Sequence, residues 1–332
     1  MLERVIVRLP NWLGDTVMAV PALRALRAGL PAARILLAGP WAAILAEDGL
    51  GDAVVEYPRA WGGRLRTADA LRAFGADTAV LLPNSLEAAL GALYAGARRR
   101  VGFAVGARVA LLSEAVPLPE PRLHQVDEYL LLVARLGVAA GATAPRLRAP
   151  GPDAPERREV LGLLAEAGAP AGRARVGVHV GAAYGSAKVW ARERAVEFCA
   201  LVVSTGRTPV VLGTARDAAL ATEVAAGSGA VSLAGRDRPG LLRALLAELE
   251  GLVCGDTGVA HLAAALGTPV AALFGPTDPR LTAPRGPVAV LRHDVPCAPC
   301  FYRTCPIDHP CMRGIEAEAV RRALDALVAR TA

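Results

Sequence analysis

The sequence contains one lysine, Lys188, among 36 arginines. It stands in the stretch AAYGSAKVW (182–190), a small-residue loop that follows the apolar run RVGVHVG (175–181). A loop of this kind between a strand and a helix lets backbone N–H groups approach a phosphate. A lysine ammonium adds a compact positive charge at the same place. The pattern indicates an anion-binding loop, and the alternative is a solvated surface lysine.

A second stretch with binding chemistry is GDTGVAHLAAALGTPVAALFGPTDP (255–279). Asp256, Thr257 and Gly258 stand between a predicted strand and a predicted helix, where the N–H groups and the helix dipole favour an anion. His261 follows one turn later. The alternative interpretation is a capped helix with a core histidine. The turn FGPTDP ends the next strand and is expected at the same edge of the sheet.

A carboxylate with catalytic potential follows the first predicted strand. Asp15 lies in NWLGDTVMAVPAL (11–23), just after Gly14, which permits a tight turn. A carboxylate at the carboxyl end of a strand can act as a general base. The alternative is that Asp15 caps the following helix.

A cysteine-rich segment, CAPCFYRTCPIDHPC, holds four of the six cysteines, Cys297, Cys300, Cys305 and Cys311. A Cys-x2-Cys pair with two further cysteines can bind zinc tetrahedrally, although the second spacing departs from the usual pair. A disulfide and reduced thiols are the alternatives. Cys199 and Cys254 are expected in the core.

The chain alternates strands and helices from end to end, which indicates two parallel α/β domains. Apolar runs predict strands at 5–9, 34–39, 53–58 and 78–83, and a second series at 175–181, 209–213, 230–235, 251–256 and 269–275. An Ala/Gly/Pro-rich connection covers 137–158, and an amphipathic helix covers 316–330. Ligands of such sheets bind at the carboxyl ends of the strands.

Composition excludes several classes of protein. The net charge of +6 favours acidic partners, but no basic run is longer than RRR (98–100) and no RNA-binding aromatic motif is present, so nucleic acid is not an expected partner. The N-terminus does not resemble a signal peptide, and no run of about 18 apolar residues could span a membrane. We expect a cytoplasmic protein and leave open a peripheral contact with the inner membrane. The first strand is not followed by GxGxxG or a Walker loop, which argues against dehydrogenases and kinases.

Taken together, these motifs resemble those of the ADP-heptose:lipopolysaccharide heptosyltransferases of glycosyltransferase family 9, especially the type II enzymes. PNWLGDTVMAVPAL is similar to the N-terminal signature of the family, and GAAYGSAKVWARERAVEFCALV is similar to its donor-site loop and helix. GDTGVAHLAAALGTPVAALFGPTDP resembles its phosphate motif, and the cysteine-rich segment resembles one that many members carry. The resemblance spans nearly the whole chain.

The resemblance implies a GT-B fold, with two Rossmann-like domains facing a cleft. It implies inverting transfer of heptose from ADP-heptose to the lipopolysaccharide inner core, with no cofactor and no metal at the reacting centre. Asp15 matches the catalytic carboxylate and Lys188 the donor-site lysine. The donor-binding positions implied are Ala183, Tyr184, Gly185, Ser186, Asp217, Asp256, Thr257, Gly258 and His261. Gly255 departs from the family, where asparagine is common.

We expect an acceptor-binding domain at 1–155, a nucleotide-sugar domain at 156–314, and a C-terminal helix at 315–332 that could return to the first domain. Charge alone suggests that the acidic acceptor is bound by basic residues of the first domain, namely Arg59, Arg64, Arg66, Arg98 and Arg99. Three alternatives stay open: another nucleotide sugar or acceptor within the family, a GT-B epimerase, and a non-catalytic binding protein.

Overall fold

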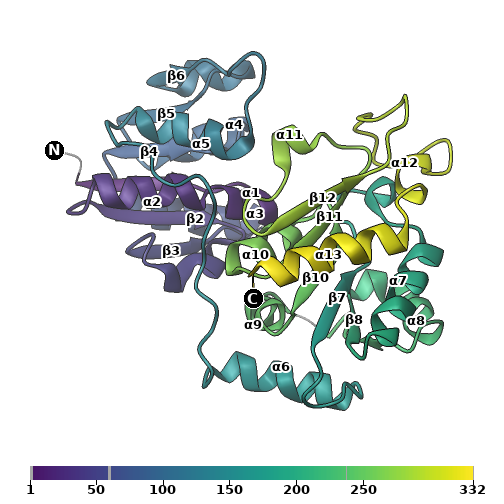
Figure 1. Ribbon diagram of the computed structural model, residues 1–332. Helices are drawn as coiled ribbons and strands as arrows, with labels where there is room; N and C mark the ends of the chain where they lie inside the picture. The colour runs from purple at the N-terminus through teal and green to yellow at the C-terminus, as the bar shows by residue number, and fades with distance from the viewer. Residues whose placement is uncertain (1–2, 59–60, 237, 332) are drawn as a thin grey trace. The chain divides into compact units, whose positions relative to one another are not determined.

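The computed structural model describes residues 3–58, 61–236 and 238–331, which form two compact units, Met1–Leu147 and Arg148–Ala332 (Figure 1). Each unit contains one six-stranded parallel sheet with its helices, which is the architecture of a GT-B fold. The division falls within the connection predicted at 137–158.

The sheet of the first unit has the order β3-β2-β1-β4-β5-β6. Its strands are β1 (Arg4–Arg8), β2 (Arg34–Gly39), β3 (Ala53–Glu56), β4 (Thr78–Leu81), β5 (Arg99–Phe103) and β6 (Glu114–Val116). The central strands are continuous apolar runs because helices cover both faces of a parallel sheet. Within β1, Ile6 faces one core and Val5 and Val7 face the other, and all three are buried.

The helices of the first unit lie on the two faces of this sheet (Figure 1). They are α1 (Leu13–Met18), α2 (Val20–Gly29), α3 (Trp61–Phe74), α4 (Leu86–Tyr94) and α5 (Gln125–Ala134), with short 3-10 helices η1 (Ala42–Asp48) and η2 (Gly106–Leu111). Helices α2 and α5 pack on each other, and α3 packs on α4. The core under α3 and α4 contains Leu71, Ala89 and Ala92.

The sheet of the second unit has the order β12-β11-β10-β7-β8-β9. Its strands are β7 (Arg175–His179), β8 (Thr208–Leu212), β9 (Val231–Ser232), β10 (Gly251–Gly255), β11 (Val270–Phe274) and β12 (Val288–Arg292). The helices are α6 (Pro155–Glu166), α7 (Arg192–Ser204), α8 (Ala218–Ala226), α9 (Pro239–Ala247), α10 (Gly258–Leu266), α11 (Pro279–Thr282), α12 (Pro310–Arg313) and α13 (Ala317–Thr331), with 3-10 helices η3 (Ser186–Lys188) and η4 (Ala215–Asp217).

The C-terminal helix α13 is part of the second unit. It packs on α7 and on β10, β11 and β12, and its Val320 and Leu324 are buried in the same core as Phe198 of α7 (Figure 1). The sequence analysis treated this helix as a separate segment that could return to the first domain. Its apolar stripe instead completes the core beside its own sheet.

In each sheet the strand order changes direction at one place, the topological switch point, and α/β sheets bind ligands at this point. In the first unit this point lies between β1 and β4, and in the second it lies between β7 and β10. The loops after these four strands are therefore the places to examine for a site.

Three strands were missed in the sequence. β5 begins with two arginines and β6 is a three-residue strand that begins with a glutamate, so neither contains a long apolar run. β12 contains the run VAVL but is half-exposed and ends in an arginine. Within the described ranges, no helix is long and apolar enough to cross a membrane.

Candidate active site

Lys188 lies at the switch point of the second sheet, where its ammonium meets Asp256. Lys188 Nζ is 2.5 Å from Asp256 Oδ2 and donates to the Asp256 backbone carbonyl at 3.2 Å. The Thr277 hydroxyl donates to the same Oδ2 at 2.8 Å. All three side chains are at least nine-tenths buried. The lysine is therefore an oriented, buried cation, and the surface-lysine alternative is wrong.

The loop that carries Lys188 is held by the cysteine-rich segment. The Tyr184 hydroxyl donates to the Phe301 carbonyl at 2.6 Å, and the Ala187 amide donates to the Arg303 carbonyl at 3.0 Å. Gly185 has φ +154°, and a Cβ there would lie 2.2 Å from the Arg303 carbonyl oxygen, so only glycine fits. These contacts fix the loop and place the Tyr184 ring 4.6 Å from Lys188 Nζ.

The start of α10 lies beside this pair. Thr257 is the N-cap residue and Gly258 begins the helix, so the free N–H groups of the first turn point out of the helix at this edge. His261 is buried in the same turn region. A Cβ on Gly255 would lie 2.6 Å from the Lys188 carbonyl oxygen. Glycine at this position lets the Lys188 backbone approach strand β10.

Asp217, matched above to a ribose-binding acid, is held by its own turn. Its carboxylate accepts from the Thr214 amide at 2.8 Å, and the Thr214 side chain accepts from the Asp217 amide, so the two residues form a capping box. The carboxylate also accepts from the Thr214 hydroxyl at 2.7 Å. It also packs against the backbone of Gly181. His179 ends β7 nearby, and burial lowers its pKa while Asp217 opposes the shift.

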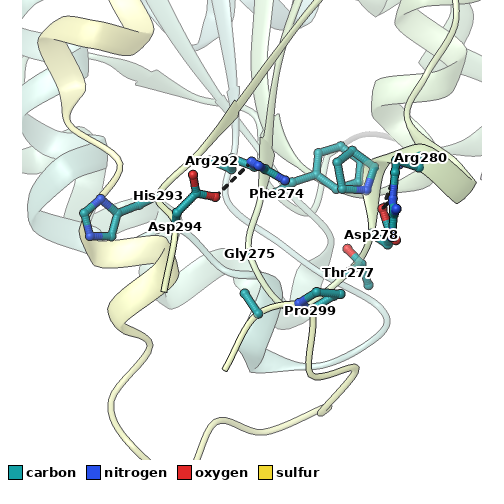
Figure 2. Close-up of a pocket in the computed structure, with 11 residues that line it drawn as sticks. Phe274, Gly275, Thr277, Asp278, Arg280, Arg292, His293, Asp294 and Pro299 are labelled. Carbon is teal, nitrogen blue, oxygen red and sulfur yellow. Dashed lines mark hydrogen bonds and ion pairs between the residues drawn. The ribbon is translucent and has the colours of Figure 1, made fainter. Parts of the chain in front are cut away.

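A pocket of about 90 Å³ lies at the carboxyl ends of β11 and β12 (Figure 2). Figure 2 shows its charged side chains in two ion pairs, Asp278 with Arg280 at 2.6 Å and Arg292 with Asp294 at 3.0 Å. Each positive charge of this pocket has a carboxylate partner, as Lys188 has in Asp256. The turn at Lys188 is better suited to a diphosphate because the N–H groups at the start of α10 lie beside it.

In the first unit, Asp15 lies inside the first turn of α1. The N-cap residue of this helix is Trp12, so the interpretation of Asp15 as a capping residue is wrong. Asp15 is partly buried near Tyr129 of α5. Burial raises the pKa of Tyr129 well above its usual value, and the negative charges of Asp15 and Glu128 add to the rise. The Asp15 carboxylate therefore follows the carboxyl end of β1, one of the two strands that flank the switch point of the first sheet.

A pocket of about 330 Å³ lies at the carboxyl ends of β1, β2 and β3, lined by Arg8, Asn11, Trp12, Pro40, Tyr57, Pro58 and Arg64. Arg8 is 4 % exposed, stacks 4.3 Å from the centre of the Tyr57 ring, and donates to Asn11 Oδ1 at 2.8 Å. Burial lowers the pKa of Arg8. Arg64 pairs with Glu87 at 3.2 Å. The positive charges of Arg8 and Arg64 exceed the negative charge of Glu87, and this excess favours an anionic ligand in the pocket.

The arginines predicted to bind the acceptor are not all together. Arg64 lines the pocket and Arg66 is exposed on α3, whereas Arg59 lies outside the described residues. Arg98 and Arg99 lie at the opposite, amino end of β5, where Arg99 pairs with Glu114 at 3.0 Å. The charge of an arginine does not show at which end of a strand it lies, so the sequence could not separate Arg98 and Arg99 from the arginine near the pocket.

Comparison with known proteins agrees with these motifs. The profile of glycosyltransferase family 9 (heptosyltransferase) matches residues 64–310. The chain belongs to this family. It is 29 % identical over 301 residues to lipopolysaccharide heptosyltransferase 2 of Salmonella typhimurium, covering 85 % of each chain.

Solved structures of the family share the fold. The E. coli ADP-heptose lps heptosyltransferase II structure aligns with a TM-score of 0.83 and 26 % identity, covering 98 % of this chain and 99 % of that one. A structure of E. coli heptosyltransferase WaaC with ADP aligns with a TM-score of 0.73 and 19 % identity, covering 98 % and 99 %. This chain is therefore a family 9 glycosyltransferase with the GT-B fold.

The cysteine-rich segment of this family 9 chain holds free thiols, so the disulfide alternative is wrong. Cys297 is exposed and Cys311 buried, and Cys300 and Cys305 lie between these extremes. Burial raises the pKa of Cys311, and the three other thiols add to the rise. Throughout the ranges described, no group of three or more His, Cys, Asp or Glu side chains is arranged to hold a metal ion. The segment's visible role is to support the Tyr184 loop.

Two residues of this site were missed in the sequence. Thr277 stands in the FGPTDP turn, which was predicted to lie at this edge, but its bond to Asp256 could not be read from the spacing. Arg8 interrupts the apolar run VIVRL. A charge at the last position of a buried strand was the available signal, because such a group needs a partner or a ligand.

Proposed function

We propose that this enzyme transfers L-glycero-D-manno-heptose from ADP-heptose to a hydroxyl of the lipopolysaccharide inner core, with inversion at the anomeric carbon. The observation that carries the proposal is the buried Lys188–Asp256–Thr277 group at the start of α10. The heptosyltransferase names of its relatives support the choice of sugar and acceptor.

The diphosphate of the donor binds at the second switch point. The N–H groups at Thr257 and Gly258 and the dipole of α10 attract its negative charge. Lys188 brings a positive charge to the same place, and its contacts with Asp256 hold the ammonium in position. As the glycosidic C–O bond breaks, ADP leaves with the electron pair, and Lys188 stabilises the growing charge on its phosphate. Oriented groups of this kind contribute on the order of 3 kcal/mol each.

Asp15 is the general base. It takes the proton of the acceptor hydroxyl while that oxygen forms the new bond to the anomeric carbon, on the face opposite ADP. Asp15 stands on α1, and its carboxylate is close enough to the buried Tyr129 to add to the rise that burial causes in the pKa of that phenol. The positive charge needed for departure comes from Lys188 and α10, so the reaction needs no metal, and EDTA should leave the rate unchanged.

The acceptor binds in the pocket at the carboxyl ends of β1, β2 and β3. Arg8 and Arg64 give it two positive charges, and the half-exposed Trp12 gives it an apolar surface for a sugar ring. The acidic sugars or phosphates of an inner core match this combination. Arg98 and Arg99 do not belong to this pocket, because they lie at the amino end of β5.

The test is a transfer assay with ADP-heptose and a heptosyl-Kdo2-lipid acceptor. Wild type should transfer heptose, Asp15→Asn and Lys188→Ala should lose at least a hundredfold in kcat, and the exposed controls Asp153→Asn and Arg158→Ala should keep the rate. NMR of the product reports the anomeric configuration. Binding of ADP without transfer would overturn the choice of substrates and call for a screen of other nucleotide sugars and acceptors.

A further inference from the structure

Helix α4 buries its small residues and exposes its large ones. Ala88, Ala89 and Ala92 face the sheet and are buried. Leu86, Leu90, Leu93 and Tyr94 are 46–49 % exposed. These four positions follow the i, i+4, i+7, i+8 spacing, so they form one continuous face, which we call the α4 stripe.

The α4 stripe is the reverse of an ordinary surface helix, which turns its large apolar residues toward the core. Single exposed leucines are common, but a row of large apolar side chains on one helix face marks a surface that meets an apolar partner. The neighbouring 3-10 helix η2 packs on α4 and adds Val109, which is 40 % exposed.

Arginines border the α4 stripe. Arg72 on α3 and Arg98, four residues after the end of α4, are both exposed, and we call these two the arginine rim. The Arg72 guanidinium lies 5.4 Å from the centre of the Tyr94 ring. The surface is therefore an apolar row with a cationic rim.

The acids near the α4 stripe are already engaged. Asp69 accepts a hydrogen bond from the Tyr94 hydroxyl at 2.7 Å, and Glu87 pairs with Arg64 at 3.2 Å. The hydrogen bond from Tyr94 does not neutralise Asp69, but Arg72 and Arg98 outnumber this one carboxylate, so the arginine rim keeps a net positive charge for an anionic partner.

The α4 stripe begins beside the proposed acceptor pocket. Ser85 caps α4 in the loop after β4, and Glu87 in the first helical turn pairs with Arg64, which lines the pocket. A substrate whose sugar lies in the pocket and whose lipid stays in a bilayer needs such a surface close by.

We propose that the α4 stripe and its arginine rim dock the first unit on an anionic lipid surface. This inference rests on the proposed function, because it takes the acceptor to be lipid-linked. Leucine and tyrosine enter the interfacial region, and the arginines meet lipid phosphates.

A second copy of the chain fits this surface less well. In a symmetric dimer each arginine rim would meet the other, and like charges oppose such an interface. A nine-residue helix is about 13 Å long, and its one face is much smaller than the roughly 800 Å² that each partner of a stable interface buries.

The first experiment is co-sedimentation with vesicles of phosphatidylethanolamine and phosphatidylglycerol in equal parts. Wild type should bind these and not vesicles of phosphatidylcholine alone. Leu90→Gln/Leu93→Gln should lower the partition coefficient about tenfold, and Arg72→Gln/Arg98→Gln about fivefold per arginine. The matched controls Leu131→Gln/Leu161→Gln and Arg158→Gln/Arg173→Gln change exposed residues elsewhere and should bind as wild type does.

The second experiment separates docking from catalysis. Leu90→Gln/Leu93→Gln should keep the wild-type rate on a deacylated, water-soluble acceptor and lose at least fivefold on the same acceptor carried in vesicles. Equal vesicle binding by wild type and this variant would overturn the docking proposal. The proposal would also fail if light scattering showed that wild type is a dimer and that the variant is a monomer. Absence of transfer by wild type to either acceptor, with vesicle binding intact, would instead count against the proposed function.

Discussion

At the scale of single residues, the contrast between one lysine and 36 arginines has a structural explanation. Lys188 Nζ uses two of its three donors on Asp256, at the carboxylate and at the backbone carbonyl, which leaves one for a phosphate oxygen. The Tyr184 ring covers it at 4.6 Å. A planar guanidinium is larger and could not reach the same atoms without moving that ring.

Lys188→Arg should therefore rescue little of the activity that Lys188→Ala removes. We expect kcat to fall at least a hundredfold in the alanine variant, because a charge aimed at the leaving group is lost. The arginine variant should stay within about tenfold of it, since the charge is present but misplaced. Steady-state kinetics and ADP titration measure both effects. Wild-type kcat in Lys188→Arg would contradict the requirement for a compact cation.

The cysteines should differ in reactivity according to burial. Burial raises the pKa of both Cys199 and Cys254 to about 12, so almost no thiolate exists at neutral pH. A maleimide at pH 7.5 should label the exposed Cys297 in the native protein and should reach Cys199 and Cys254 only after unfolding. Peptide mass spectrometry gives the answer. Rapid native labelling of Cys254 would contradict the packing of β10.

At the scale of secondary structure, the three members of the Lys188–Asp256–Thr277 group each follow the end of a strand. Lys188 follows β7, Asp256 follows β10, and Thr277 follows β11. The parallel register brings β7, β10 and β11 side by side, so their ends meet although Lys188 and Thr277 are far apart in sequence. The cysteine-rich segment then holds the β7 turn in place through Tyr184 and Ala187.

The end of β7 should make stability depend on pH. Burial lowers the pKa of His179, so the folded state prefers the neutral imidazole and the unfolded state binds the proton more readily. This contribution is complete above the unfolded pKa of about 6.5 and is lost as pH falls below it. The unfolding midpoint in urea should therefore fall less steeply from pH 7.5 to 5.5 in His179→Gln than in wild type. Identical pH dependence would exclude His179 as the cause.

Helix α13 should be needed for the second core. Leu324 is 1 % exposed and lies close against Gly251 of β10. Leu324→Ala removes a buried side chain and leaves a cavity, so we expect a loss of about 2–5 kcal/mol in the free energy of unfolding. Urea unfolding followed by circular dichroism measures it. The exposed Leu161→Ala on α6 is the control and should change stability by less than about 1 kcal/mol. If Leu324→Ala also changed the free energy of unfolding by less than about 1 kcal/mol, packing of α13 would not be needed for the stability of the second core.

At the scale of the whole molecule, each unit has its own sheet, its own core and its own switch point. The proposed donor-binding groups belong to the second unit, whereas Asp15 and the arginine-lined pocket proposed for the acceptor belong to the first. The proposed function therefore gives nucleotide binding to the second unit and acceptor binding and proton removal to the first.

Residues 148–332 expressed alone should fold and bind ADP but transfer no heptose. Their core is complete without the first unit, and Lys188, Asp256 and α10 are all present. Urea unfolding tests cooperativity and calorimetry tests binding, with full-length Lys188→Ala as the weak-binding control. A folded fragment with no affinity for ADP would show that the first unit supplies essential donor contacts.

The sequence by itself determined the two parallel α/β domains and the positions of the reactive turns. Central parallel strands are buried on both faces, so they read as continuous apolar runs, and the residues just after them must lie at the carboxyl edge. That is why Lys188, Asp256 and Asp15 could be selected from the linear pattern. Strands β5 and β6 begin with charged residues and β12 is half-exposed and ends in an arginine, so these three escaped prediction.

Only the tertiary structure decided which groups meet. The pairing of Lys188 with Asp256 and Thr277 depends on strand order. The contact of Arg8 with Tyr57 depends on the fold, which brings the end of β1 and the residue after β3 to the same edge of the sheet. Neither of these contacts can be predicted from the spacing of the residues along the chain. The same reason separates Arg64, which lines the pocket, from Arg99, which lies at the other end of its strand. Charge is a property of a residue, whereas a binding site is a property of the positions that the fold assigns to several residues at once.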